Sequence, residues 1–106
     1  MSYRYMRLIL FFDLPVETGT DRREYARFRK LLVKSGFLMM QKSVYCKLAV
    51  NQAAADAMMV TVRKNKPPRG TVQALLITEK QYSRIEYILG ARSGDVLDSD
   101  ERFVEL

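Results

Sequence analysis

The first hydrophobic segment of the chain is a continuous run of aromatic and aliphatic residues over 3–13, which ends on Asp13. The run has no helical spacing, and Leu14-Pro15 follows it at once. Continuous apolar runs bounded by a turn signal are typical of a central strand buried on both faces. Pro15 cannot donate to a strand ladder and disfavours a helical Leu14, so the strand is predicted to end near Asp13. One carboxylate is thereby placed at the rim of a sheet, on a rigid element.

Side chains alternate along a strand, and here both faces carry large apolar groups. One face is predicted to hold Leu8, Leu10 and Phe12, and the other Arg7, Ile9 and Phe11. A sheet with two apolar faces needs a covering layer on each side.

The next segment predicts an amphipathic helix that begins at Asp21 and ends before Gly36. Asp21 as N-cap, with Glu24 at the third helical position, resembles a capping box, and Gly36 supplies the left-handed residue that closes a helix. The buried side is predicted to hold Tyr25, Phe28, Leu31, Leu32 and Ser35. Basic residues recur at helical spacing on another side, at Arg23, Arg27, Lys30 and Lys34, with Arg22 beside them.

Residues 37–50 contain no Gly or Pro and are rich in strand formers. Most strands run about three to ten residues, so a break is predicted near 41–43, giving two short strands. In the second strand, apolar residues alternate with a more polar set, which predicts that the apolar set faces inward. The apolar set is Val44, Cys46, Leu48 and Val50, and the other is Ser43, Tyr45 and Lys47.

The second half of the chain predicts a further helix and strand. Asn51 is expected to cap a helix over 52–64. Its predicted inner face is Ala54, Ala57, Met58, Thr61 and Val62. A breaker over 64–70, a strand over 71–78, one helical turn capped by Thr78 and Gln81, and a short strand over 85–89 follow, with a last short strand expected at 103–106.

This order predicts an α+β protein with the ferredoxin-like βαββαβ arrangement, one antiparallel sheet with two helices on one face. The domain is expected to cover 1–90, and an acidic loop and extension strand 91–106. The helices cover only one side of the sheet, so a homodimer that joins sheet to sheet is predicted to cover the other.

The formal charge of +6 is unevenly spread: residues 1–50 hold ten Lys/Arg against four Asp/Glu, and residues 91–106 hold two against five. A basic body with an acidic tail favours a polyanionic partner, most simply nucleic acid. The basic row on the first helix is predicted to contact phosphates, although most charged helix faces are merely solvated; Lys64, Lys66 and Arg69 would extend that surface.

The rare residues narrow the chemistry. The chain has no histidine and one cysteine, Cys46, which leaves neither the usual zinc ligands nor the commonest general acid–base. A lone cysteine, the lack of a signal-peptide pattern and the lack of an apolar run of about 18 residues favour a cytoplasmic protein. Cys46 itself is predicted to be a buried small hydrophobe.

Three motifs in order resemble one known family: Phe12-Asp-Leu-Pro15, a basic helix closing on Gly36-Phe37, and Gln41-Lys-Ser-Val-Tyr45. They are similar to the CRISPR-associated protein number two family, the small core subunit of the CRISPR spacer-acquisition machinery. The segments 6–13 and 78–84 look closest to members from type II systems.

The resemblance implies a ferredoxin-like homodimer with Asp13 as a metal ligand, for Mg²⁺, at the dimer axis. It implies two activities for the family: a metal-dependent endoribonuclease or nuclease, and a scaffold that carries duplex DNA and bridges two dimers of the CRISPR-associated integrase. It also implies that the carboxy-terminal strand, with Phe103, Val104 and Leu106, pairs with the neighbouring subunit or docks the integrase.

Alternatives remain open at each site. Asp13 could instead form a turn ahead of Pro15, since one carboxylate rarely holds Mg²⁺ without other oxygens. Ser43 and Tyr45 could bind a phosphate or be plain sheet-surface or interface positions. The thin supply of metal ligands ranks the scaffold above the nuclease, and a toxin-like ribonuclease or simple nucleic-acid-binding module is a third class.

Overall fold

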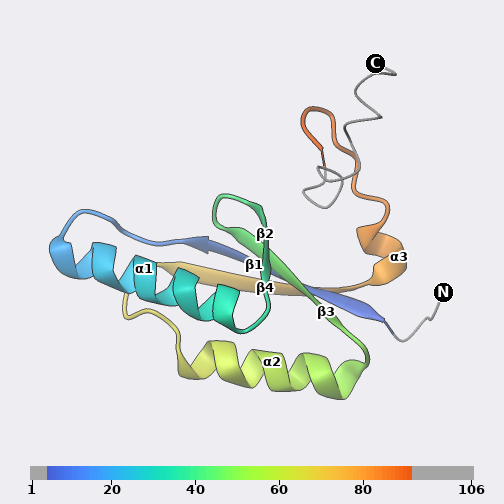
Figure 1. Cartoon of the computed structure of the whole chain (residues 1–106), viewed down its shortest axis with the longest axis horizontal. Coiled ribbons are helices and arrows are strands. Elements are labelled where there is room, and N and C mark those ends of the chain that lie inside the picture. The colour runs from blue at the N-terminus through green and yellow to red at the C-terminus, as the bar shows by residue number, and fades with distance from the viewer. Residues whose placement is uncertain (1–4, 92–106) are drawn as a thin grey trace.

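A computed structural model of the protein describes residues 5–91. Its elements in chain order are β1 (Met6–Asp13), α1 (Gly19–Lys34), β2 (Leu38–Gln41), β3 (Val44–Ala49), α2 (Gln52–Lys64), β4 (Thr71–Thr78) and α3 (Glu79–Tyr82) (Figure 1). Over this range, none of the helices has both the length and the apolar character that a membrane crossing needs. The strand predicted at 103–106 lies outside the described residues.

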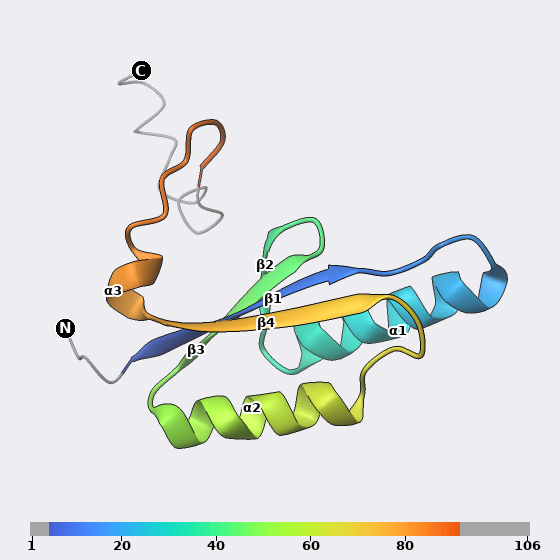
Figure 2. The same cartoon turned by 180° about the vertical axis from the view of Figure 1, so that it is seen from behind.

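The four strands form one antiparallel sheet in the order β2-β3-β1-β4. The first hydrophobic run is a central strand, as predicted, and pairs with β3 on one side and β4 on the other. Helices α1 and α2 lie on the same face of the sheet in both views (Figures 1 and 2). The ferredoxin-like βαββαβ fold predicted from the sequence is confirmed.

The main core lies between the sheet and these two helices. It holds Leu8, Leu10 and Phe12, which share one face of β1. It centres on Phe12, whose ring meets Phe28 edge-on at 5.3 Å and stacks on Tyr45 at 5.6 Å between centroids. The predicted buried side of α1 is confirmed: Phe28 and Leu32 are buried, and Tyr25 and Leu31 pack against them. This core fixes where the end of β1 lies relative to α1.

Helix α1 begins three residues earlier than predicted. Its N-cap is Thr18, whose hydroxyl accepts from the Asp21 N–H at 3.0 Å, while the Asp21 carboxylate accepts from the Thr18 N–H at 3.3 Å. Asp21 is therefore the third helical residue of the capping box and not the N-cap. Gly36 ends the helix as predicted, at φ +96°.

The break between β2 and β3 is confirmed, with Ser43 in the left-handed region at φ 66°. The predicted inward face of β3 is wrong. Tyr45 pairs with Leu10 and so points into the main core, where it is 2% exposed, whereas Leu48 is 39% exposed on the opposite face. Because Cys46 is also buried, on that opposite face, both faces of β3 are apolar and alternation alone cannot tell them apart.

Helix α2 has the predicted bounds and the predicted cap, with the Asn51 side chain accepting from the Ala54 N–H at 2.8 Å. Its inner face is rotated from the predicted one: Ala55 and Val62 are buried, and Ala57 and Thr61 are exposed. The first half of this helix is mostly alanine, which gives almost no contrast between its faces.

Between β4 and residue 91, one prediction is confirmed and one is wrong. The single turn α3 forms with the predicted Thr78–Gln81 capping box. Residues 85–89, predicted to be a strand, have no regular structure, because this segment pairs with none of the four strands of the sheet over residues 5–91.

The sheet face opposite the helices is only partly covered. Tyr82 of α3 packs on Ile9 and Cys46 in a second, smaller cluster. Beyond it, Phe11 and Leu75 stay 36% and 48% exposed. We call this surface the open face of the sheet.

Candidate nucleic-acid interface and strand-end carboxylate

Asp13 is the last residue of β1 and its side chain is exposed. It pairs with Thr71 at the start of β4, and side-chain alternation puts it on the open face with Phe11. Its neighbours Phe12 and Leu14 are buried in the main core. The carboxylate is thus presented to solvent from a backbone that is anchored on both sides.

Gly70 tightens this anchoring. It has a φ of +101°, and a Cβ added there would lie 2.7 Å from the Asp13 carbonyl oxygen and 2.9 Å from Leu14 Cδ2. Only glycine allows the chain to pass so close behind Asp13. The start of β4 therefore packs directly against the backbone that carries the carboxylate.

One chain does not complete a magnesium site at Asp13. Mg²⁺ in proteins usually takes one or two carboxylates together with waters and substrate phosphates. Over residues 5–91, no three Asp, Glu, Cys or His side chains come together as a metal-binding group. Asp13 fits such an ion only if a second carboxylate, from another copy of the chain, and a phosphate complete the coordination.

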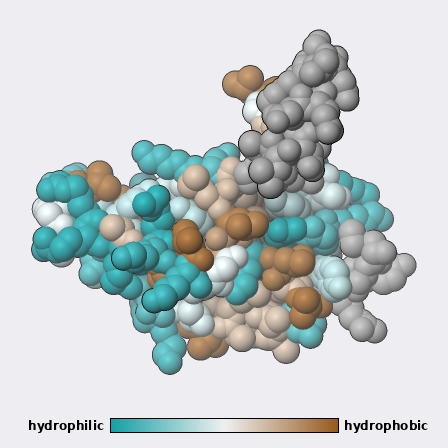
Figure 3. Space-filling view, in the orientation of Figure 1, coloured by the Kyte–Doolittle hydropathy of each residue, from teal (hydrophilic) through white to brown (hydrophobic). Residues whose placement is uncertain are grey.

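The basic row on α1 is exposed along its whole length, and its members are Arg23, Arg27, Lys30 and Lys34. Hydrophilic side chains cover the α1 side of the molecule, whereas less polar ones gather over α2 (Figure 3). Arg23 contacts only Thr20 Oγ1, at 3.2 Å, among the hydrogen bonds of the described residues. We refer to these four residues as the α1 basic row.

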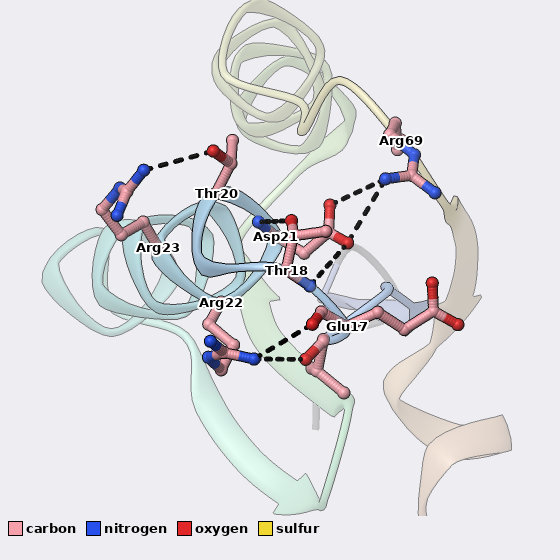
Figure 4. A network of polar contacts seen from close by, with 8 residues as sticks. Glu17, Thr18, Thr20, Asp21, Arg22, Arg23 and Arg69 are labelled. Atoms are coloured by element: carbon pink, nitrogen blue, oxygen red, sulfur yellow. Dashed lines mark hydrogen bonds and ion pairs between the residues drawn. The ribbon is translucent and has the colours of Figure 1, made fainter.

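Arg22 does not belong to this row. Its Nη1 donates to the carbonyl oxygens of Val16 and Glu17, at 3.1 and 3.2 Å, and so braces the loop before α1 (Figure 4). Arg29, which the sequence reasoning missed, is exposed and lies seven residues, about two turns, after Arg22. The two form a second basic line on α1, and the same i, i+7 spacing that revealed the first row would have found it.

The acidic residues of α1 are all paired with arginines. Glu24 accepts from Arg27 Nε at 2.8 Å, and Asp21 accepts from Arg69 Nη1 at 3.0 Å. Their negative charges are offset locally, so the outer surface of α1 stays positive.

Ser43 and Tyr45 do not form a phosphate site. Tyr45 is buried beneath α1. Ser43 lies in the turn before it, and its carbonyl oxygen accepts a hydrogen bond from the Phe12 N–H at 3.0 Å. Cys46 is buried, as predicted. The predicted docking residues Phe103, Val104 and Leu106 lie outside the described residues.

A third cluster of polar groups lies on the open face. Arg7 donates to both carboxylate oxygens of Glu79, at 3.0 and 2.6 Å, and its guanidinium lies 4.1 Å from the ring centre of Tyr82. Burial is the main cause that raises the pKa of Tyr82 above its ordinary value, with Cys46 adding to it and Arg7 opposing it. These contacts fasten α3 onto the sheet.

The ferredoxin-like fold and the three sequence motifs are those expected of a small CRISPR-associated protein, and the comparisons with known proteins test this expectation. The profile of the family described as CRISPR associated protein Cas2 matches residues 6–85. The chain is 52% identical over 101 residues to the "CRISPR-associated endoribonuclease Cas2" of Treponema denticola, an alignment that covers 95% of this chain and 100% of that relative. The chain therefore belongs to the Cas2 family.

Two further comparisons bear on the family and on the fold, respectively. The protein of the same name from Streptococcus mutans serotype c strain UA159 is 44% identical over 101 residues, covering 95% of this chain and 93% of that protein. A solved structure titled "Crystal structure of cas2" matches with a TM-score of 0.59 over 84% of this chain and 91% of that chain. At 18% identity it supports the fold alone.

Proposed function

We propose that the protein is a spacer-acquisition subunit that works as a homodimer, binds duplex DNA and bridges two dimers of the CRISPR-associated integrase. The observation that carries this proposal is the α1 basic row, an exposed and nearly unmixed positive surface on a fold of the Cas2 family. The lone, buried Cys46 is compatible with the cytoplasm, where the proposal places the protein.

The open face supports the dimer. Phe11, Leu48 and Leu75 leave apolar surface in water, and a second copy stacked on this face would cover it. Asp13 shares the face, so a two-fold axis near it would bring two carboxylates together. The edge of β4 is free over the described residues, and a strand carrying Phe103, Val104 and Leu106 of another copy could pair there or dock the integrase.

The α1 basic row suits a duplex backbone in length. From Arg23 to Lys34 it extends about 16 Å at about 1.5 Å per residue, enough to follow several successive phosphates. Contacts of this kind hold DNA of any sequence and weaken with salt, because each neutralised phosphate releases counterions. A subunit that carries spacers of arbitrary sequence needs such binding.

The second candidate function is a metal-dependent nuclease, favoured by the names of the relatives, which are called endoribonucleases. In that case Asp13 from two copies would hold Mg²⁺, which when bound would supply an activated water. The sequence has no histidine that could transfer a proton in such a reaction. The two functions differ in what Asp13 does, and we rank the scaffold first.

The experiment that tests DNA binding replaces Arg23 and Lys30 by alanine together. Neither residue anchors another element, so the fold is expected to persist. Binding of a fluorescent 30-base-pair duplex should weaken for all sequences. The slope of log affinity against log salt concentration should flatten by about 0.9 for each phosphate that is no longer neutralised. At 0.1 M salt, each such loss corresponds to about eightfold weaker binding.

The matched control is Lys80→Ala with Arg84→Ala. It removes the same number of charges from exposed positions in and just after α3. The control should keep nearly the slope of the native protein. Equal effects of both pairs, or no effect of the first, would show that the α1 basic row is not the path of the DNA.

A further inference from the structure

The segment between α2 and β4, residues 65–70, lies against the N-terminal half of α1. The tie at its start is Arg27, whose Nη2 donates to the Asn65 carbonyl at 3.0 Å while its Nε donates to Glu24 at 2.8 Å. The guanidinium is thus held between two elements. We call residues 65–70 the α2–β4 linker.

The tie at the other end of the linker is an ion pair. Arg69 Nη1 donates to both carboxylate oxygens of Asp21, at 3.0 and 3.3 Å, and the Thr18 N–H donates to the same carboxylate (Figure 4). The Asp21 side chain is 5% exposed, whereas that of Arg69 is 60% exposed. A buried carboxylate in the first turn of α1 therefore fastens a linker 48 residues away in sequence.

Between α1 and the linker lies an open hollow of about 490 Å³. Its lining is mostly polar: Glu24, Arg27, Lys64, Asn65, Lys66, Pro67 and Pro68. The three cations exceed the one acid, which Arg27 already pairs. Lys64 and Lys66 are exposed and form no ion pair within residues 5–91.

Stabilisation of α2 explains only part of the positive charge around the hollow. A cation in the last turn of a helix, such as Lys64, interacts favourably with the helix dipole. Lys66 lies beyond α2, and Arg27 belongs to another helix. Their convergence on one hollow follows from the two ties.

We infer that the linker forms a second wall of the nucleic-acid site, in which Arg27, Lys64 and Lys66 together receive backbone phosphate. Asp21, although acidic, is the positioning residue of this wall because it fixes Arg69 and the linker beside α1. A guanidinium held in place in advance loses less freedom when it binds a phosphate. This inference rests on the proposed binding of DNA and adds a site to it.

Asp21→Asn tests the positioning role through the sign of its effect. The substitution removes a negative charge from a basic surface, so charge alone predicts tighter binding of a 30-base-pair duplex. Positioning predicts the opposite: the ion pair with Arg69 is broken, and affinity falls, by up to about eightfold at 0.1 M salt for each phosphate that is no longer neutralised. Binding as tight as, or tighter than, that of the native protein would overturn the inference.

Asp56→Asn is the matched control. Asp56 is exposed on α2 and accepts only from Gln52, at 3.0 Å, among the hydrogen bonds of the described residues. The same change of charge there should leave affinity unchanged or raise it slightly. Weaker binding in this control equal to that in Asp21→Asn would also overturn the positioning role.

Lys64→Ala with Lys66→Ala tests the phosphate contacts of the second wall. It leaves the Arg27–Asn65 and Arg69–Asp21 contacts in place, so it remains informative even if Asp21→Asn does not fold. The pair should flatten the salt slope by about 0.9 for each phosphate that these lysines neutralise in the native protein. If this pair has no effect while Arg23→Ala with Lys30→Ala does, the second wall is wrong and the proposed function stands. If neither pair has an effect, DNA binding on this side of the protein fails as a whole.

Discussion

Replacing Gly70 by alanine should destabilise the protein by about 3 kcal/mol. The native φ of +101° costs an L-residue roughly 1–2 kcal/mol. The new Cβ would lie 2.7 Å from the Asp13 carbonyl oxygen, which is backbone and cannot rotate away, and overpacking of this kind costs about 1–3 kcal/mol. The lower entropy of the unfolded alanine chain returns only about 0.4–1 kcal/mol.

Gly90→Ala is the matched control for this prediction. Gly90 also has a positive φ, of +89°, but a Cβ there would meet nothing within 4 Å. It should therefore cost only the backbone strain, about 1 kcal/mol after the same entropic return. Urea unfolding at one fixed protein concentration measures both, because the stability of the proposed dimer would depend on concentration. A loss of stability for Gly70→Ala no larger than that for Gly90→Ala would refute the close packing behind Asp13.

Three further predictions concern the helix cap, the open face and the dimer. Thr18→Ala should cost about 1 kcal/mol in urea unfolding, because it removes the cap on the Asp21 N–H, and an unchanged stability would argue against Thr18 as N-cap. Because the pKa of Tyr82 is raised in the folded protein, the unfolded chain releases this proton first, above about pH 10. The free energy of unfolding should therefore fall as the pH rises from the unfolded pKa through the folded pKa. Tyr82→Phe should reduce the difference in unfolding free energy between about pH 9 and pH 11, as measured by urea unfolding. Sedimentation at micromolar concentration should give a dimer that Leu75→Ser weakens, and a stable 12.3 kDa monomer of the native chain would contradict the sheet-to-sheet arrangement.

The elements that sequence reasoning predicted well have strong local signals at their ends. Pro15 ends β1, Gly36 ends α1, and Asn51 begins α2, each through a backbone requirement that any tertiary context must respect. The strand order then follows from connectivity. For these reasons the fold could be predicted from the chain alone.

The wrong predictions fall into two kinds. In one, two residues carry the same local signal, and in the other, the contact that decides the structure involves a residue far away in the sequence. Thr18 and Asp21 both satisfy a capping-box spacing, and either could be the N-cap on local grounds. In the structure Thr18 is the N-cap, and Asp21 pairs with Arg69, 48 residues away. Tyr45 joins the aromatic core because it pairs with Leu10, which alternation in β3 alone does not reveal. The predicted strand at 85–89 has strand-forming residues but no neighbouring strand within the described residues.

The candidate site divides in the same way. The positions of Asp13, at the end of β1, and of the α1 basic row, on an exposed helix face, could be predicted because strand ends and helical spacing are local features. The separate role of Arg22 and the tie between Asp21 and Arg69 depend on contacts between distant parts of the chain.

Spacer acquisition in cells that carry Asp13→Ala, beside cells that carry Arg23→Ala with Lys30→Ala, tests the central claim most directly. Both variants change exposed side chains, so both proteins should fold. Their binding to the integrase is measured alongside acquisition. The scaffold account predicts that new spacers continue to appear with Asp13→Ala and become rare with the other variant. Loss of acquisition with a folded, integrase-binding Asp13→Ala protein would contradict the account and put the nuclease first.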